Sequence, residues 1–216
     1  AVAGKIARFH KNAQTGGTID EMGSIRMIRR NNEENFAQTE KYVDMTIPAY
    51  QYRFIREYVE RFLDANRPLL EKRVAEHKIR DCHGDLHLEH ICIAEDIIIF
   101  DCIEFNERFR FSDTAAEVAF LTMDLDYNGY YRHSDDFARS YLNYSGDTDM
   151  TALLNFYRCY YAYVRGKVTS FRLDQKEMPD HERDHIIQIA LKYFDLAYTY
   201  AARLEKPALI LTAGLI

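Results

Sequence analysis

The stretch that decides the fold reads His83-Gly84-Asp85-Leu86-His87-Leu88-Glu89-His90. It leads directly into two short β-branched runs, Ile91-Cys92-Ile93 and Ile97-Ile98-Ile99-Phe100, and Asp101 follows the second run. Because β-branched residues favour strands and only three residues separate the runs, the pattern predicts a β-hairpin. We expect its second strand to be buried, since it is strongly apolar, and Asp101 to emerge from the core at its edge.

The chain on both sides of this hairpin has the apolar periodicity of helices. Residues 1–13 and the stretch from Phe54 to Phe62 show it, and Pro68 interrupts the second pattern. Residues 14–31 hold three glycines and predict a loop, and residues 33–45 predict a short helix. After the hairpin we expect helices over 113–127, 132–144, 148–173 and 181–205. The predicted fold class is therefore mainly α (α+β), with one small hairpin.

Composition narrows the possible partners. The 216 residues carry a formal net charge of −6, without a basic stripe, which argues against nucleic-acid binding. No apolar run approaches the length of a membrane span, so no membrane partner is expected. The four cysteines form no C-x-x-C pair, and three of them, Cys82, Cys92 and Cys102, lie where we expect buried strands or strand edges. This usage indicates reduced cysteines and a cytoplasmic location.

Two carboxylates flank the predicted hairpin and are the strongest candidates for chemistry. Asp85 precedes the hairpin on a loop, and Asp101 stands at its far end, so the two side chains can converge. One such carboxylate can accept a proton while the other holds a divalent cation. The simpler interpretation is that both residues only cap turns, as aspartate often does.

Protein kinases carry a similar arrangement, with a catalytic loop H-R-D-L-x-x-x-N before the metal-binding Asp of D-F-G. Here His83, Asp85 and Leu86 are in register, and the form HGDLH resembles the aminoglycoside phosphotransferase-like kinases, which act on small-molecule hydroxyls. An uncharacterised bacterial branch of that family is similar in Phe100-Asp101-Cys102-Ile103-Glu104-Phe105-Asn106, Arg110, Asp113, Ala119 to Leu125, Tyr141 to Asp147, and Val164-Arg165-Gly166-Lys167-Val168.

The resemblance covers essentially the whole chain and implies the helical C-terminal lobe of a kinase-like fold over residues 1–205. No strand-rich segment precedes residue 80, so we expect the N-terminal lobe to lie outside this chain and the chain alone to be inactive. Members of the branch often continue into a P-loop kinase module. Residues 206–216 resemble its first strand, so the chain is expected to be a piece of a longer polypeptide.

The resemblance also implies roles for single residues. Asp85 would be the catalytic base, with ATP as phosphoryl donor and Asp101 holding Mg²⁺, assisted by Glu104. His83 would brace the loop, and Asp113 would cap the next helix and tie back to the loop. His90 stands where the family has a metal-binding Asn, and Mg²⁺ prefers oxygen to imidazole. Three alternatives follow for the metal site: His90 shifts its preference toward Mn²⁺, Asp101 and Glu104 bind the metal without His90, or metal binding is weakened.

Two other functions stay open. The imidazoles of His83, His87 and His90, with the thiols of Cys82, Cys92 and Cys102, offer zinc ligands, although the C-x-x-C and H-E-x-x-H spacings are missing. Alternatively, the lobe is a non-catalytic scaffold or ligand sensor for the P-loop module. His90 favours that interpretation, whereas two neighbouring carboxylates, which repel each other, argue against it.

The acceptor is open: an antibiotic, a sugar, an amino alcohol or another metabolite hydroxyl. In such folds the substrate pocket lies between the catalytic loop and the later helices. Those helices carry Asp124, Asp126, Asp174 and Glu177, which would suit a cationic or polyhydroxyl ligand. At least one of Arg165 and Lys167 is expected to pair with a carboxylate. The runs Arg29-Arg30 and Glu71-Lys72-Arg73 are expected to be solvated surface.

Overall fold

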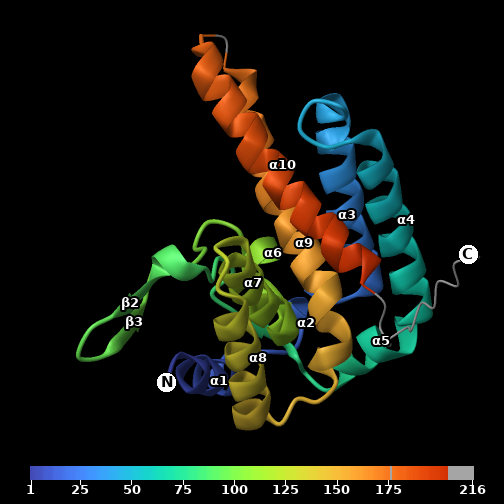
Figure 1. Ribbon diagram of the computed structural model, residues 1–216. Coiled ribbons are helices and arrows are strands. Elements are labelled where there is room, and N and C mark those ends of the chain that lie inside the picture. Colours follow the sequence, from blue (N-terminus) through green and yellow to red (C-terminus); the bar gives the residue numbers. More distant parts are fainter. Residues whose placement is uncertain (176, 204–216) are drawn as a thin grey trace, which may run out of the picture.

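The computed structural model describes residues 1–175 and 177–203, and most of them are helical (Figure 1). The helices are α1 (Val2–Asn12), α2 (Thr18–Met22), α3 (Ile25–Thr39), α4 (Ala49–Ala65), α5 (Arg67–Ala75), α6 (Glu107–Arg110), α7 (Thr114–Tyr127), α8 (Tyr131–Ser145), α9 (Met150–Phe171) and α10 (Asp180–Ala202). The strands are β1 (Ile79–Asp81), β2 (Ile91–Ile93), β3 (Ile97–Ile99) and β4 (Phe111–Asp113). The predicted mainly α, α+β class is confirmed, whereas the strand expected after Pro207 lies outside the described residues.

The core is built around α7. Every residue from Thr114 to Asp126 is buried, because this alanine-rich helix is apolar on nearly all sides. It packs against α8 and α9, and α9 in turn runs beside α10 along much of its length (Figure 1). The α9–α10 approach is close: a Cβ on Gly166 would lie 3.0 Å from the Phe194 ring. On the other sides α1 covers α8, and α3 packs on α9.

The N-terminal part differs from the prediction of a loop over residues 14–31. That segment contains α2 and the first turns of α3, and the helix predicted over 33–45 is the end of α3 followed by a short 3-10 turn, Glu40–Tyr42. Ser24 starts α3, since its side chain accepts a hydrogen bond from the Met27 amide. Met27 and Ile28 then bury one face of the first turns, which stabilises a helix that the glycines around it concealed.

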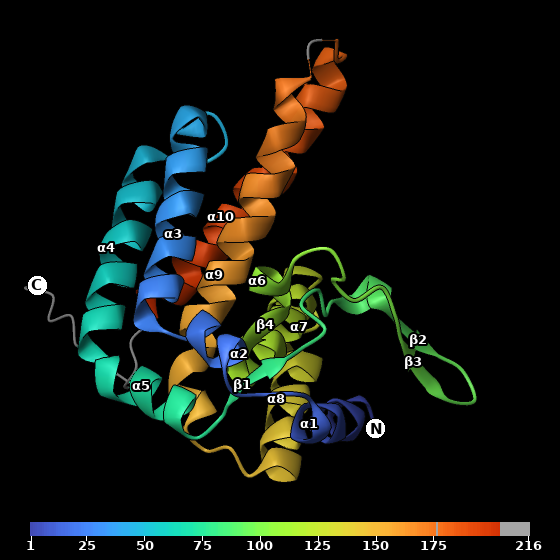
Figure 2. The ribbon, with the colours of Figure 1, turned by 180° about the vertical axis from the view of Figure 1, so that it is seen from behind.

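The strands form two separate antiparallel pairs. In the first, β1 pairs with β4, with Arg80 opposite Ser112, and this pair supports the loop that starts at Cys82. In the second, β2 and β3 form the predicted hairpin, which projects from the helical body in both views (Figures 1 and 2).

The expectation that the second strand of this hairpin is buried was wrong. Ile98 and Phe100 are about half exposed, because a two-stranded ribbon presents two faces and only Ile91 and Ile99 pack against the core. For the same reason Cys92 is exposed, and so is Cys102 after the hairpin; of the three cysteines expected in buried strands or strand edges, only Cys82 is buried. Among the described helices, none has the length and apolar character needed to cross a membrane.

Candidate active site

The loop between β1 and the hairpin carries Asp85 and is fixed to the core at both ends. The Cys82 amide donates to the Arg110 carbonyl, and the side chain of Leu86 is buried in the main core. Further along, the Leu88 amide donates to the Asp124 carboxylate of α7 over 2.8 Å. Asp85 therefore lies on a segment whose backbone is held by α7 and by the β1–β4 pair, which suits a precisely placed catalytic group.

His83 connects the segment that carries Asp85 to the segment that carries Asp101. Its Nε2 donates to the Phe100 carbonyl at 2.8 Å, because a carbonyl only accepts. In the neutral ring Nδ1 is then an acceptor, and the Asp85 amide lies 3.3 Å from it. The Ile103 amide donates to the His83 carbonyl as well. His83 is thus a brace between the two segments.

His90 lies between the two candidate carboxylates. Its Nδ1 donates to the Asp85 carbonyl at 2.8 Å and lies 3.6 Å from Asp85 Oδ2, while its Nε2 lies 3.3 Å from Asp101 Oδ2. The Nε2 atom faces the Asp101 carboxylate, and either a second ring proton or a bound metal ion between the two makes this contact favourable. This is the usual arrangement of a metal-binding histidine, whose other nitrogen donates to a backbone carbonyl.

The two carboxylates have different surroundings. Asp85 is half-buried, and burial alone would raise its pKa; the contact with His87 and the positive charges of His87, His90 and Arg165 outweigh this and hold the pKa below its usual range. Asp85 is therefore ionised at neutral pH. Asp101 is 74% exposed and has a left-handed backbone, with φ of +62°. An exposed carboxylate at the end of the hairpin is accessible to a ligand from outside.

Asp85 and Asp101 open onto a cavity of about 1000 Å³. Its walls come from α3, the Asp85 loop, the segment from Asp101 to Asp113, and the pocket-facing side of α9. That side of α9 carries Tyr157, Tyr160 and Tyr161, followed by Arg165 and Lys167. Glu104 lines the same cavity and is exposed. The cavity thus lies between the catalytic-type loop and the later helices, and it is large enough for a small-molecule ligand.

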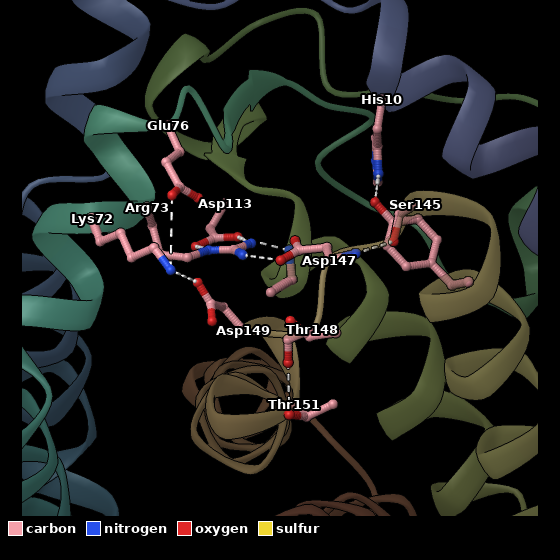
Figure 3. A network of polar contacts seen from close by, with 12 residues as sticks. His10, Lys72, Arg73, Glu76, Asp113, Ser145, Asp147, Thr148, Asp149 and Thr151 are labelled. Carbon is pink, nitrogen blue, oxygen red and sulfur yellow. Dashed lines mark hydrogen bonds and ion pairs between the residues drawn. The ribbon is translucent and has the colours of Figure 1, made fainter.

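Asp113 caps α7, since its carboxylate accepts from the Ala115 amide at 2.8 Å. Asp113 was also expected to contact the loop that carries Asp85. Instead, both of its carboxylate oxygens accept hydrogen bonds from Arg73 of α5, at 2.9 and 2.5 Å (Figure 3). Arg73 also donates to Asp147 and is fully buried, so the expectation that Glu71-Lys72-Arg73 is solvated throughout was wrong. A buried guanidinium is stable here because two carboxylates share its charge.

Sequence reasoning missed the residues that hold the loop from behind. The Gly84 amide donates to Glu117 Oε1 at 2.7 Å, and His10 Nε2 donates to Glu117 Oε2 at 2.5 Å. His10 Nδ1 is in turn 2.7 Å from the Tyr141 hydroxyl. All of these side chains are buried. The available signal was a single glutamate inside the apolar run of α7, because a buried carboxylate needs partners.

The acids expected to face a substrate do not line the cavity. Asp124 and Asp126 are buried and accept hydrogen bonds from the Leu88 amide and the Tyr200 hydroxyl, respectively. Asp174 pairs with Lys41, and Glu177 is exposed elsewhere. Neither Arg165 nor Lys167 forms an ion pair at contact distance among the described residues: Asp124 and Asp85 act on Arg165 only from further away, and Lys167 donates to two amide oxygens.

The zinc ligands suggested by the sequence are not assembled as a set. Within the described residues two groups have metal-binding geometry, His10–Cys82–Glu117 and Asp85–His87–His90. The first group is internally satisfied, because both nitrogens of His10 and both oxygens of Glu117 already form hydrogen bonds. Cys92 and Cys102 belong to neither group.

Comparison with known proteins gives relatives without an assigned activity. No protein-family model matches the chain, and no solved structure matches it significantly. The chain is similar to the uncharacterized proteins Mb2027c of Mycobacterium bovis and MT2060 and Rv2004c of Mycobacterium tuberculosis. Each is 34% identical over 176 residues, which cover 81% of this chain and 35% of the relative. The chain therefore spans about a third of their length, and a functional argument rests on the site.

Proposed function

We propose that this chain carries the catalytic carboxylates of an ATP- and metal-dependent phosphotransferase that acts on a small-molecule hydroxyl. The observation that carries the proposal is the position of His90 between Asp85 and Asp101, two carboxylates that line a cavity of about 1000 Å³. A braced loop carboxylate and a second carboxylate after a hairpin are the parts that kinase-type phosphoryl transfer needs from this lobe.

In the proposed reaction, the acceptor hydroxyl oxygen attacks the γ-phosphorus of ATP. The bond between that phosphorus and the β–γ bridging oxygen breaks, ADP leaves with the electron pair, and the hydroxyl proton passes to Asp85. Asp85 suits this role because its lowered pKa keeps it ionised at neutral pH. His83 and Glu117 keep the Asp85 backbone in place, so the carboxylate is positioned before the substrate arrives.

The donor set fits a divalent cation. Asp101 and His90 would hold it, with Glu104 on the same cavity wall, and the cation would neutralise charge on the β- and γ-phosphates. Because one ligand is an imidazole nitrogen, the set suits Mn²⁺ at least as well as Mg²⁺.

The decisive experiment measures label transfer from γ-labelled ATP to pooled small-molecule hydroxyl compounds by the full-length protein, with Mg²⁺ or Mn²⁺. Asp85→Asn should reduce transfer by about 10²- to 10⁴-fold, the usual contribution of a general base. Asp135→Asn, an exposed change on α8, serves as the matched control. If Asp85→Asn leaves transfer unchanged while disruption of a P-loop elsewhere in the protein abolishes it, the lobe is a binding or regulatory module.

A transition-metal site is a second candidate, favoured by the Asp85–His87–His90 group. Asp85 Oδ2 lies 3.6 Å from His87 Nε2 and 3.6 Å from His90 Nδ1, and the two rings are 3.9 Å apart. Metal analysis of protein purified without an affinity tag tests it. Stoichiometric zinc that is lost in His87→Gln would support this site and contradict the role of Asp85 as a free base.

A further inference from the structure

Lys167 is the most informative group in the cavity that the proposed reaction does not use. Its ammonium donates to Asn35 Oδ1 at 2.7 Å and to Gln38 Oε1 at 2.8 Å, and both partners are neutral amides of α3. Lys167 is half-buried and belongs to no ion pair among the described residues. Burial lowers the pKa of this ammonium, and its neutral amide partners leave its positive charge uncompensated.

The wall around Lys167, formed by α3, α6 and α9, carries an excess of positive charge, whereas the other carboxylates of the cavity lie on the Asp85 loop and on the segment from Asp101 to Asp113. Glu34 is the carboxylate of this wall, and it already binds two guanidinium groups, those of Arg30 and Arg108. Arg165, on the N-terminal side of Lys167 in α9, lies 5.7 Å from the Tyr193 ring centre; it forms no ion pair at contact distance in the described chain, although Asp124 and Asp85 act on it from further away. The elements that form this wall, α3, α6 and α9, are seen in Figure 2. A cationic ligand would be repelled here, whereas an anion would be attracted.

Asn35 supplies an independent observation. Its oxygen accepts from Lys167; its buried amide nitrogen interacts with the Tyr160 hydroxyl but forms no hydrogen bond of normal geometry in the described residues. Asn35 is only 6% exposed and lines the cavity. A buried donor whose hydrogen bond is poorly formed is stabilised when a ligand supplies a better-placed oxygen. The donor and the ammonium of Lys167 meet in one place.

We propose that the acceptor is a hydroxylated small molecule bearing an oxyanion, a carboxylate or a phosphate, which Lys167 and Asn35 bind while a hydroxyl group reaches Asp85. The claim that a hydroxyl group reaches Asp85 rests on the proposed function. The anion site formed by Lys167 and Asn35 is independent of phosphoryl transfer. It replaces the cationic ligand class that the sequence suggested, because the acids behind that suggestion do not line the cavity.

The test measures binding of four related probes to the full-length protein by calorimetry at low salt, without nucleotide or metal. Gluconate carries a carboxylate, glucose 6-phosphate a phosphate, glucose no charge and glucosamine a positive charge. At least one anionic probe should bind at least about tenfold more tightly than glucose and glucosamine, as expected for a charge-assisted hydrogen bond. Comparison of gluconate with glucose 6-phosphate identifies which oxyanion the site takes.

Three variants assign that binding to the site. Lys167→Met and Asn35→Asp should each weaken binding of the anionic probe by at least about tenfold, the second because it places a negative charge against the ligand. Lys167→Arg should retain part of the affinity. Lys11→Met, an exposed change on α1, is the control and should change nothing. Thermal unfolding of each variant establishes that it is folded before its affinity is compared.

The outcomes separate this inference from the proposed function. Absence of binding by both anionic probes, equal binding of glucose, or unchanged affinity in folded Lys167→Met would overturn the anion site. Label transfer to glucose or glucosamine, but not to the anionic compounds, would also overturn it while leaving the phosphotransferase intact. Lys167-dependent binding without any label transfer would support the anion site and contradict the phosphotransferase.

Discussion

Gly84 lies between His83 and Asp85, the proposed base, and has a backbone conformation that favours glycine. Its φ is +84°, and a Cβ added there would meet the Arg110 Cα at 3.1 Å and the Phe109 carbonyl oxygen at 3.2 Å. Both neighbours are backbone atoms, so neither can move away cheaply. The glycine of the HGDLH stretch is therefore required by the close approach of the loop to the chain before β4.

Gly84→Ala should destabilise the protein and displace Asp85. Gly129→Ala is a matched control, because Gly129 has nearly the same φ, +82°, but nothing within 4 Å of an added Cβ. Backbone strain should lower the free energy of unfolding of both variants by about 1–2 kcal/mol. Gly84→Ala should lose at least about 1 kcal/mol more, because of crowding. Urea denaturation measures the difference, and equal losses would contradict the close-contact argument.

At the scale of elements, the sequence predicted well where one physical effect dominates. The hairpin and the long helices α7 to α10 follow from β-branched runs and apolar periodicity, and tertiary packing reinforces both. The sequence analysis predicted a loop where α2 and the start of α3 lie, because the three glycines there are typical of loops. The Ser24 cap and the burial of Met27 stabilise the start of α3 in spite of them. The exposure of the hairpin was missed because composition does not show which face of a two-stranded ribbon has a partner.

The site shows the same division between local and long-range information. Asp85 and Asp101 flank one hairpin, which was enough to predict that they converge, and the kinase-like motif placed His90 with them. His10 and Glu117 are 107 residues apart, and Lys167 and Asn35 are 132 apart. Such pairs depend on how whole helices pack, for which a single sequence gives no direct indication.

Glu117 links three elements, α7, α1 and the Asp85 loop, and gives a testable dependence on pH. Burial alone would raise its pKa, but the hydrogen bonds from His10 and Gly84 and the nearby His83 outweigh it, and the pKa lies below the usual 4.5. A lowered pKa in the folded state means that ionised Glu117 stabilises the protein above about pH 4.5, and this contribution is lost as pH falls through the folded-state pKa.

Glu117→Gln should lower the free energy of unfolding at pH 7 by about 1.5–3 kcal/mol, the usual contribution of hydrogen bonds to a charged group. The difference from the unmodified protein should shrink as the pH is lowered below about 4.5. Denaturant unfolding at several pH values measures both effects. Glu95→Gln, in the exposed hairpin turn, should show neither. A difference that stays constant with pH would contradict the assigned ionisation of Glu117.

At the scale of the whole molecule, one buried cation joins segments that are distant in sequence. Arg73 of α5 binds Asp113, at the end of β4 and the start of α7, and Asp147, between α8 and α9 (Figure 3). Burial alone would lower the pKa of Arg73, but the two carboxylates outweigh this and raise it, so the group stays charged. Through Asp113 this contact fixes the start of α7, the helix whose Glu117 holds the Asp85 loop.

Removing this charge should therefore affect the entire fold. Arg73→Met leaves the buried carboxylates of Asp113 and Asp147 without a counter-charge and should lower the free energy of unfolding by about 3–5 kcal/mol in chemical denaturation. Lys72→Met, its exposed neighbour paired with Asp149, should cause little change. Adding Asp147→Asn to Arg73→Met should restore part of the loss, because it removes one of the two unpaired charges. A loss no larger than that of Lys72→Met would show that helix packing alone, without the buried ion pairs, holds α5, α7 and α9 together.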